Sequence, residues 1–173
     1  DCFTRSRFPV RVRARPLGTK MKEKREHQTF HVGFKAFIAD GEKLLILQDG
    51  EGLWELPGGR VEKQEIFKPL QEILARETAE ELGKQLKYEA GPVFHAWIRK
   101  PAHSQNIASV YRDNDFCIFL VGIRCTYKSG DVVVSPEHTG FRWITREEID
   151  ELQFENTYKE AIQKYFENFR NVL

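Results

Sequence analysis

The sequence predicts an α+β domain in which a mixed β-sheet lies between helices. Strand-like runs of apolar residues recur along most of the chain, whereas helical periodicity appears once in the middle and twice near the end. The length of 173 residues suits one domain, and hydrophobic residues make up 40% of it, which is enough for a packed core. These observations favour a sheet that is covered by helices.

The first part of the chain is expected to form two strands and a loop. Residues 28–39 are apolar and aromatic and predict a strand, and residues 43–48 predict a second one after a short turn. Residues 49–59 are rich in glycine and predict a loop. Within that loop, Trp54 and Leu56 are expected to pack inward.

A central helix is expected to begin near Pro69 and to end before Gly83. Proline is tolerated in the first turn of a helix, and glycine is common just past its end. At about 100° per residue, the apolar side chains share one side of this helix and the acidic ones lie on a neighbouring side. One face therefore packs on the sheet while the other lines a cleft. The apolar side comprises Leu70, Leu74, Ala75, Thr78 and Leu82.

The second half is expected to add three strands and two helices. Thr145 followed by Glu148 forms a capping box that opens a short helix. Apolar side chains at helical spacing predict a final helix from about Thr157 to Phe169. The strands are expected over residues 85–99, 107–127 and 141–144, the first of them interrupted at Gly91–Pro92.

Residues 1–20 differ from the rest of the chain and predict a basic leader or tail that is not part of the fold. They hold six basic side chains and one acid, and Met21 is the only methionine. A single domain is therefore expected over residues 21–173. In that domain the acidic side chains outnumber the basic ones, so no basic field for nucleic acid is expected.

The cysteines and the hydropathy indicate a cytoplasmic protein. Cys2, Cys117 and Cys125 show no CxxC spacing, and the last two lie in apolar sequence as buried small residues of a reducing compartment would. No apolar run reaches the 18 residues that a membrane span requires, so no contact with a membrane is expected.

Three acidic residues of the central helix form the most informative cluster. Glu77, Glu80 and Glu81 are spaced by three and four residues and therefore share one helix face. Like charges repel there unless something positive lies among them, and a divalent cation meets this need. An isolated cluster of this kind is usually only a solvated face. The glycine pair Gly58–Gly59 upstream suits the close approach of a phosphate or a metal and favours the metal interpretation.

The combination resembles the signature of the Nudix hydrolase family. In that signature a glycine is followed by five residues, a glutamate, seven residues and then R-E-U-x-E-E-x-G-U, where U is bulky and apolar. The chain departs from it in holding ten residues between Glu65 and Arg76 and in placing Gln64, Thr78 and Lys84 at less typical positions. We place the three extra residues in the loop before Pro69. The matching residues are Gly59, Glu65, Arg76, Glu77, Glu80, Glu81 and Gly83.

The resemblance implies a Nudix-type α-β-α sandwich and a hydrolase that attacks a phosphorus of a nucleoside diphosphate linked to another moiety. Such a substrate includes a nucleotide sugar, an ADP-ribose-like molecule or a nucleoside triphosphate. The implied cofactor is Mg²⁺, with Mn²⁺ as an alternative, because a hard cation can join carboxylate and phosphate oxygens. The implied metal ligands are Glu77, Glu80, Glu81 and the Gly58 carbonyl oxygen.

The implied catalytic residues are Glu77, Glu80 and Glu137, the last as general base on a loop near the far end of the sheet. Glu62, Glu65 and His138 are other candidates for the base. Arg76 is expected to pair with a nearby glutamate and fix the loop on the helix, or else to form an ordinary pair with Glu72 or Glu80.

Substrate recognition is less defined by the sequence. Trp54 is a candidate platform for a nucleobase, and Arg60 and Arg99 are candidates for phosphate binding. Phe34, Tyr111 and Phe116 are alternative platforms, Lys100 and Arg112 are alternative phosphate-binding residues, and Pro101 lies where some ADP-ribose-cleaving members carry a proline.

Two other functions compete with the hydrolase. A nucleotide-sensing or interaction module on the same fold is the alternative, although it would be favoured by missing carboxylates and none is missing. The isomerase branch of the fold needs a cysteine in a polar cleft, which the apolar surroundings of Cys117 and Cys125 argue against. The expected partner is a nucleotide-derived small molecule. Nucleic acid is not expected as a partner except as an RNA 5′ end, and the sequence is compatible with a homodimer.

Overall fold

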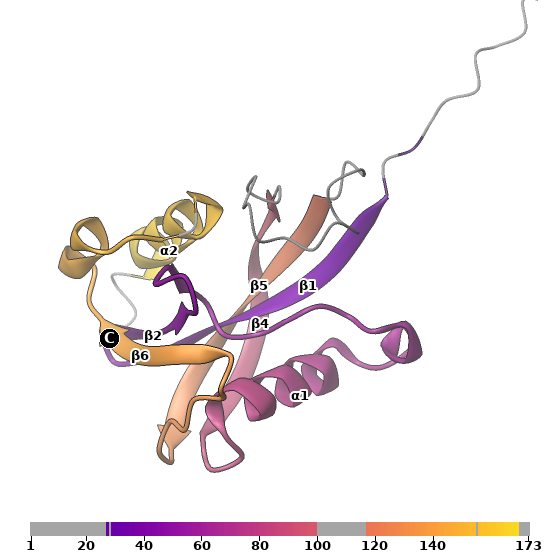
Figure 1. Ribbon diagram of the computed structural model, residues 1–173, viewed down its shortest axis with the longest axis horizontal. Coiled ribbons are helices and arrows are strands. Elements are labelled where there is room, and N and C mark those ends of the chain that lie inside the picture. The colour runs from indigo at the N-terminus through magenta and orange to yellow at the C-terminus, as the bar shows by residue number, and fades with distance from the viewer. Residues whose placement is uncertain (1–26, 28, 100–116, 155, 170–173) are drawn as a thin grey trace, which may run out of the picture.

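A computed structural model describes residues 27, 29–99, 117–154 and 156–169 and shows a six-stranded mixed sheet with a helix on each side (Figure 1). The strand order is β3-β2-β1-β5-β4, and β6 pairs with β2. The strands are β1 (Phe30–Asp40), β2 (Lys43–Asp49), β3 (Trp54–Glu55), β4 (Lys87–Arg99), β5 (Cys117–Ser129) and β6 (His138–Ile144), and the helices are α1 (Leu70–Leu82) and α2 (Asn156–Phe169). Short 3-10 helices cover Lys63–Glu65 and Glu147–Glu151.

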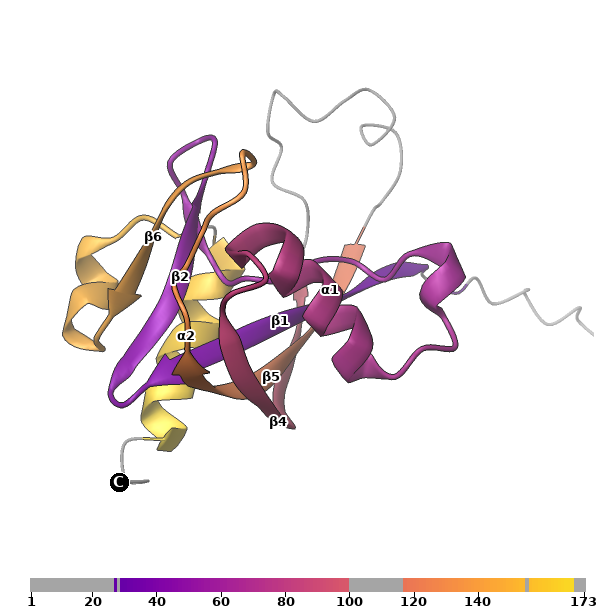
Figure 2. The ribbon, with the colours of Figure 1, turned by 90° about the horizontal axis from the view of Figure 1, so that it is seen from below.

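Strand β1 pairs with β5 in parallel over most of its length, whereas it pairs with β2 only near the turn that joins them. The register runs from Phe30 opposite Cys117 to Ala39 opposite Thr126. Figure 2 shows the result: β2 and β6 diverge in direction from β1, β5 and β4. The first half of β1 is therefore left for another segment to pair with.

Alternation along the strands builds a hydrophobic core on each face of the sheet. Successive side chains of a strand point to opposite faces. Phe37 thus joins the core beneath α2, whereas its neighbours Ala36 and Ile38 join the core beneath α1. Leu74 and Leu82 of α1 are fully buried in the second of these cores. This confirms the predicted sandwich of a mixed sheet between helices.

The predicted boundaries of the central helix are confirmed. Pro69 is the residue before the first helical turn, and Gly83 follows the last turn with a φ of 82°. The helix packs through Leu74, Thr78 and Leu82, as the projection predicts. Ala75 is exposed instead, because the buried stripe includes Ile73 in its place.

Other elements differ from expectation in detail. Gly91–Pro92 does not end β4, because the register shift between Ala90 and Val93 absorbs the irregularity. The glycine-rich loop contains the two-residue strand β3. The carboxylate of Glu148 accepts a bond from the Thr145 backbone N–H at 2.8 Å, which is half of the predicted capping box. No helix within the described residues is long and apolar enough to cross a membrane.

Candidate active site

The Pro57–Val61 segment pairs with the free half of β1. The backbone N–H groups of Phe34 and Ala36 donate to the carbonyl oxygens of Gly59 and Pro57 at 2.9 and 2.8 Å, and the Val61 N–H donates to Val32 at 2.9 Å. The divergence of β2 makes this pairing possible. The segment is thereby fixed beside the acidic face of α1.

Close contacts require glycine at position 58. Gly58 has a φ of 115°, which side-chain-bearing residues rarely adopt, and a Cβ there would overlap the Phe34 carbonyl oxygen. A Cβ on Gly59 would overlap the Glu77 carboxylate, which would then have to move. The loop therefore approaches the backbone of β1 more closely than any other residue type allows, and it lies against the end of the Glu77 side chain.

The Arg76 guanidinium lies among the carboxylates of the site. Its Nε and Nη2 donate to Glu65 Oε1 and Oε2 at 2.7 and 2.8 Å. The same Nη2 donates to Glu77 Oε1 at 2.7 Å, and Nη1 donates to Glu80 Oε2 at 3.1 Å. The expectation that Arg76 fixes the loop on the helix is confirmed. Part of the negative charge that the sequence assigns to a divalent cation is thus offset by Arg76.

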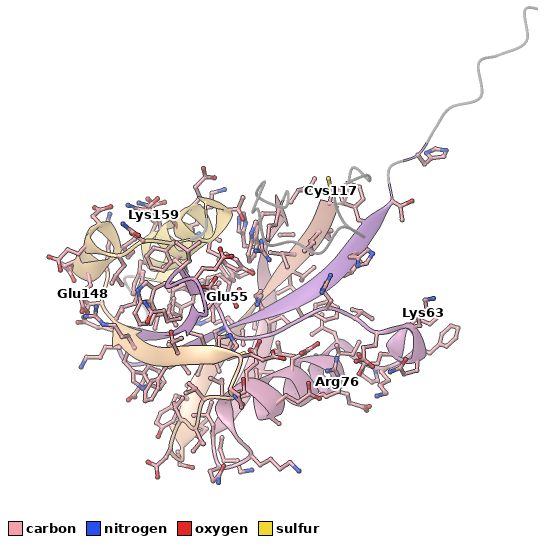
Figure 3. All side chains as sticks on the ribbon, in the orientation of Figure 1. Glu55, Lys63, Arg76, Cys117, Glu148 and Lys159 are labelled. Carbon is pink, nitrogen blue, oxygen red and sulfur yellow. The ribbon has the colours of Figure 1, made fainter. Side chains whose placement is uncertain are left out.

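Glu65 contacts Arg76 despite the longer spacing between them in the signature. Residues 66–68 form an exposed turn before Pro69, with Phe67 94% exposed, while Glu65 is only 1% exposed. Figure 3 shows Arg76 on α1, near the short helix that carries Lys63 and Glu65. The ten residues between Glu65 and Arg76 therefore allow the glutamate to reach the guanidinium.

The Arg76–Glu65 pair predicts a dependence of stability on pH. The bonds from Arg76 lower the pKa of Glu65 from 4.5 to about 2, although burial opposes the shift. A lowered pKa stabilises the fold above about pH 4.5, and this contribution is lost as the pH falls toward 2. We expect Arg76→Gln to unfold at a lower urea concentration than the wild type at pH 7, and the difference between their urea midpoints to be smaller at pH 3. A difference of the same size at both pH values would contradict this assignment.

The carboxylates of Glu77 and Glu81 are more buried than that of Glu80, and this burial disfavours their ionised forms. Burial raises the pKa of both, while Arg76 acts in the opposite direction on Glu77 and Lys35 does so on Glu81. Glu81 Oε2 accepts a hydrogen bond from the Gly58 N–H at 2.6 Å, which joins the helix to the loop. A bound cation would favour the ionised form of both carboxylates.

The donor set fits magnesium by its chemistry. Carboxylate oxygens are ligands that this ion prefers, and those of Glu77, Glu80 and Glu81 lie around the junction of α1 and the loop. The Gly58 carbonyl oxygen, which was expected to be a further ligand, accepts the Lys35 ammonium instead, so a cationic side chain already occupies the place of a metal ion there. Within the described ranges, no three His, Cys, Asp or Glu side chains converge closely enough to hold a metal ion. Glu77 and Glu80 contact Arg76 in this arrangement instead.

A buried polar network that the sequence did not indicate continues inward from Glu81. The Lys35 ammonium, 6% exposed, donates to the Leu56 carbonyl oxygen at 2.8 Å and to the Gly58 carbonyl oxygen, and lies 3.5 Å from Glu55 Oε2. The Glu55 side chain, labelled in Figure 3, is mostly buried, with 20% exposed. Its other oxygen lies 3.4 Å from His138 Nε2. Burial raises the pKa of Glu55, but Lys35 and His138 outweigh this effect and lower the pKa to about 2.

Of the residues suggested for catalysis and binding, Glu137 and Arg99 lie close to this network. Glu137 is exposed in a turn that reaches the end of α1, where the Ser135 N–H donates to the Glu81 carbonyl oxygen at 2.9 Å. The Arg99 guanidinium lies 5.7 Å from the centre of the Tyr158 ring, which also lies 5.5 Å from the Lys35 ammonium.

The other two suggested binding residues lie outside this network, Arg60 directly after the glycine pair and Trp54 in β3. Arg60 is exposed, and its backbone pairs with that of Gly33 in an isolated antiparallel β-bridge. Trp54 packs against the core beneath α2, and the Arg142 guanidinium lies 6.0 Å from its ring. The suggestions Lys100, Pro101, Tyr111, Arg112 and Phe116 fall outside the described residues.

The two described cysteines are free, and Cys125 is buried. Burial raises the pKa of the Cys125 thiol to about 12, so it stays protonated at neutral pH. This confirms the interpretation of Cys125 as a buried apolar residue, whereas Cys117 is only partly buried.

One family matches most of the chain. The family model described as NUDIX domain matches residues 29–165. A MutT-like protein from Streptomyces ambofaciens is 29% identical over 112 residues, which make up 65% of this chain and 60% of that relative. The chain therefore spans less than two thirds of the length of this curated relative.

Solved structures share the fold at low sequence identity. A NUDIX hydrolase from Nitrosomonas europaea has a TM-score of 0.63 at 18% identity, covering 85% of this chain and 76% of that one. An ADP-ribose pyrophosphatase from Streptococcus suis has a TM-score of 0.57 at 22% identity, covering 84% of this chain and 96% of that one. Together with the matched domain and the arrangement of Arg76 and its glutamates, these findings show that the chain belongs to the Nudix hydrolase family.

Proposed function

We propose that the chain is a Mg²⁺-dependent pyrophosphohydrolase that cleaves the pyrophosphate bond of a nucleoside diphosphate linked to another moiety. The observation that carries this proposal is that the carboxylates of Glu77 and Glu81 lie against the Gly58–Gly59 loop. When bound there, the metal ion would offset phosphate charge and acidify a water molecule.

The residues of the site have separate roles in this proposal. Glu77, Glu80 and Glu81 supply the oxygen ligands, and Arg76 keeps the helix and loop together while balancing their charge. The turn that carries Glu137 adjoins the end of α1, which supports Glu137 as the general base. Arg60 and Arg99 offer cations to the phosphates or to the outer part of the substrate.

A substrate panel tests the proposal. ADP-ribose is the first compound to try, because a pyrophosphatase for it shares this fold. Nucleotide sugars, nucleoside triphosphates, dinucleoside polyphosphates and triphosphorylated RNA follow, each with Mg²⁺, with Mn²⁺ and with EDTA. We expect turnover of at least one compound that EDTA abolishes. Nucleotide binding without turnover across the panel would favour a sensing module instead.

A further inference from the structure

The carbonyl oxygens of residues 56–59 accept hydrogen bonds from β1 in two ways, from its backbone N–H groups and from one of its side chains. Those of Pro57 and Gly59 accept backbone N–H groups of β1, as in an ordinary sheet. Those of Leu56 and Gly58 accept the Lys35 ammonium instead. One lysine side chain thus satisfies two buried carbonyl groups that the sheet pairing leaves over.

The geometry of the ammonium suits this role. A lysine head group has three N–H donors, and here two carbonyl groups and the Glu55 carboxylate lie around it. Burial lowers the pKa of Lys35, but Glu55, Tyr158 and Glu81 together outweigh it, so the pKa is raised. The side chain is therefore charged at neutral pH.

Gly58 is consequently held from both sides by charged groups on different elements. Its N–H donates to Glu81 of α1, and its carbonyl oxygen accepts from Lys35 of β1. These bonds fix the two peptide groups that flank the Gly58 Cα, which has the left-handed φ noted above. The orientation of Glu81 then depends on a loop whose shape depends on Lys35.

We propose that Lys35 is a positioning residue of the metal site, whose buried ammonium holds the Gly58 carbonyl and thereby sets the loop and Glu81 in the arrangement that binds the cation. The inference rests on the proposed function, because it assigns the metal to Glu77, Glu80 and Glu81. It also gives Glu55 a role as a third oxygen acceptor beside the Lys35 ammonium, a role that the amide oxygen of a glutamine can also fill.

Two variants separate positioning from simple electrostatics. Glu55→Gln removes a negative charge but leaves Lys35 on its carbonyl groups. The double variant Lys35→Met/Glu55→Gln removes both charges, so its net charge equals that of the wild type, and it removes the ammonium. Electrostatics alone would weaken cation binding in the single variant and spare the double variant, whereas positioning predicts the reverse order.

The measurement is Mn²⁺ binding to the substrate-free full chain, followed by the electron paramagnetic resonance signal of the free ion. We expect Glu55→Gln to bind within about threefold of the wild type and the double variant about tenfold or more weakly, as for other residues that support a metal ligand. Equal or tighter binding by the double variant overturns the inference while leaving the proposed function intact. A wild type that binds no Mn²⁺ refutes both.

Far-UV circular dichroism establishes that the variants fold. If the double variant does not, Lys35→Arg takes its place, because it keeps the charge but brings a planar head group to a space shaped by an ammonium. If Lys35→Arg binds Mn²⁺ at least about fivefold more weakly than the wild type, the positioning role is supported. Unchanged binding overturns the inference.

Discussion

Replacing Glu81 by glutamine is expected to lower kcat about a thousandfold while the fold stays intact. The glutamine keeps an oxygen for the Gly58 N–H but loses the charge that we propose binds the cation. A metal ion contributes several kcal/mol to the transition state, and about 4 kcal/mol corresponds to three orders of magnitude. Because burial raises the pKa of Glu81, its ionised form costs stability, so a neutral replacement is expected to unfold at the same temperature or higher.

Glu72→Gln is the matched control for this experiment. Glu72 lies in the first turn of the same helix and is exposed. Both variants lose one carboxylate from α1, so a shared small change in rate would report only on helix charge. Full activity in Glu81→Gln, on a substrate that requires Mg²⁺, would remove Glu81 from the ligand set.

Gly58→Ala is expected to cost about 2–6 kcal/mol of unfolding free energy and to abolish most of the activity. The backbone at φ 115° is strained for alanine by about 1–3 kcal/mol. The added methyl group also overlaps the Phe34 carbonyl oxygen, and overpacking of this kind adds about 1–3 kcal/mol. Urea denaturation and the rate of substrate cleavage measure the two effects.

The same substitution at Gly140 shows what a methyl group does without such contacts. Gly140 lies in β6, its φ is not in the left-handed region, and a Cβ there would meet no atom within 4 Å. Gly140→Ala is expected to change the unfolding free energy by less than about 1 kcal/mol, since alanine is no worse than glycine in a strand. If Gly58→Ala were equally mild, the loop would have to be free to move away from β1.

The sequence predicted the elements whose signals are local. Pro69 and Gly83 mark the ends of α1 through backbone preferences of their own, so the helix was placed to within a residue. The pairing of Arg76 with a nearby glutamate was also predicted, although the spacing alone could not show that Glu65 would be that partner.

The inner half of the site depends on contacts that are distant in sequence. Lys35 is a single basic residue in an apolar strand, and its partners are backbone carbonyl groups of a loop more than twenty residues away. A sequence does not display which carbonyl groups a sheet will leave without partners. The one available signal was the alternation of β1, which places Lys35 on the same face of the sheet as Phe37, the face beneath α2.

The parallel pairing of β1 with β5 has a consequence for how the chain acquires its structure. Phe30 lies opposite Cys117, so the centre of the sheet joins segments from the two halves of the chain. Contacts between segments so distant in sequence slow folding, because the intervening chain must lose entropy before they form. On the ribosome, helix α1, which carries the proposed metal ligands, is therefore expected to emerge long before the strand that completes its supporting sheet, and the domain is expected to fold completely only after synthesis has passed β5.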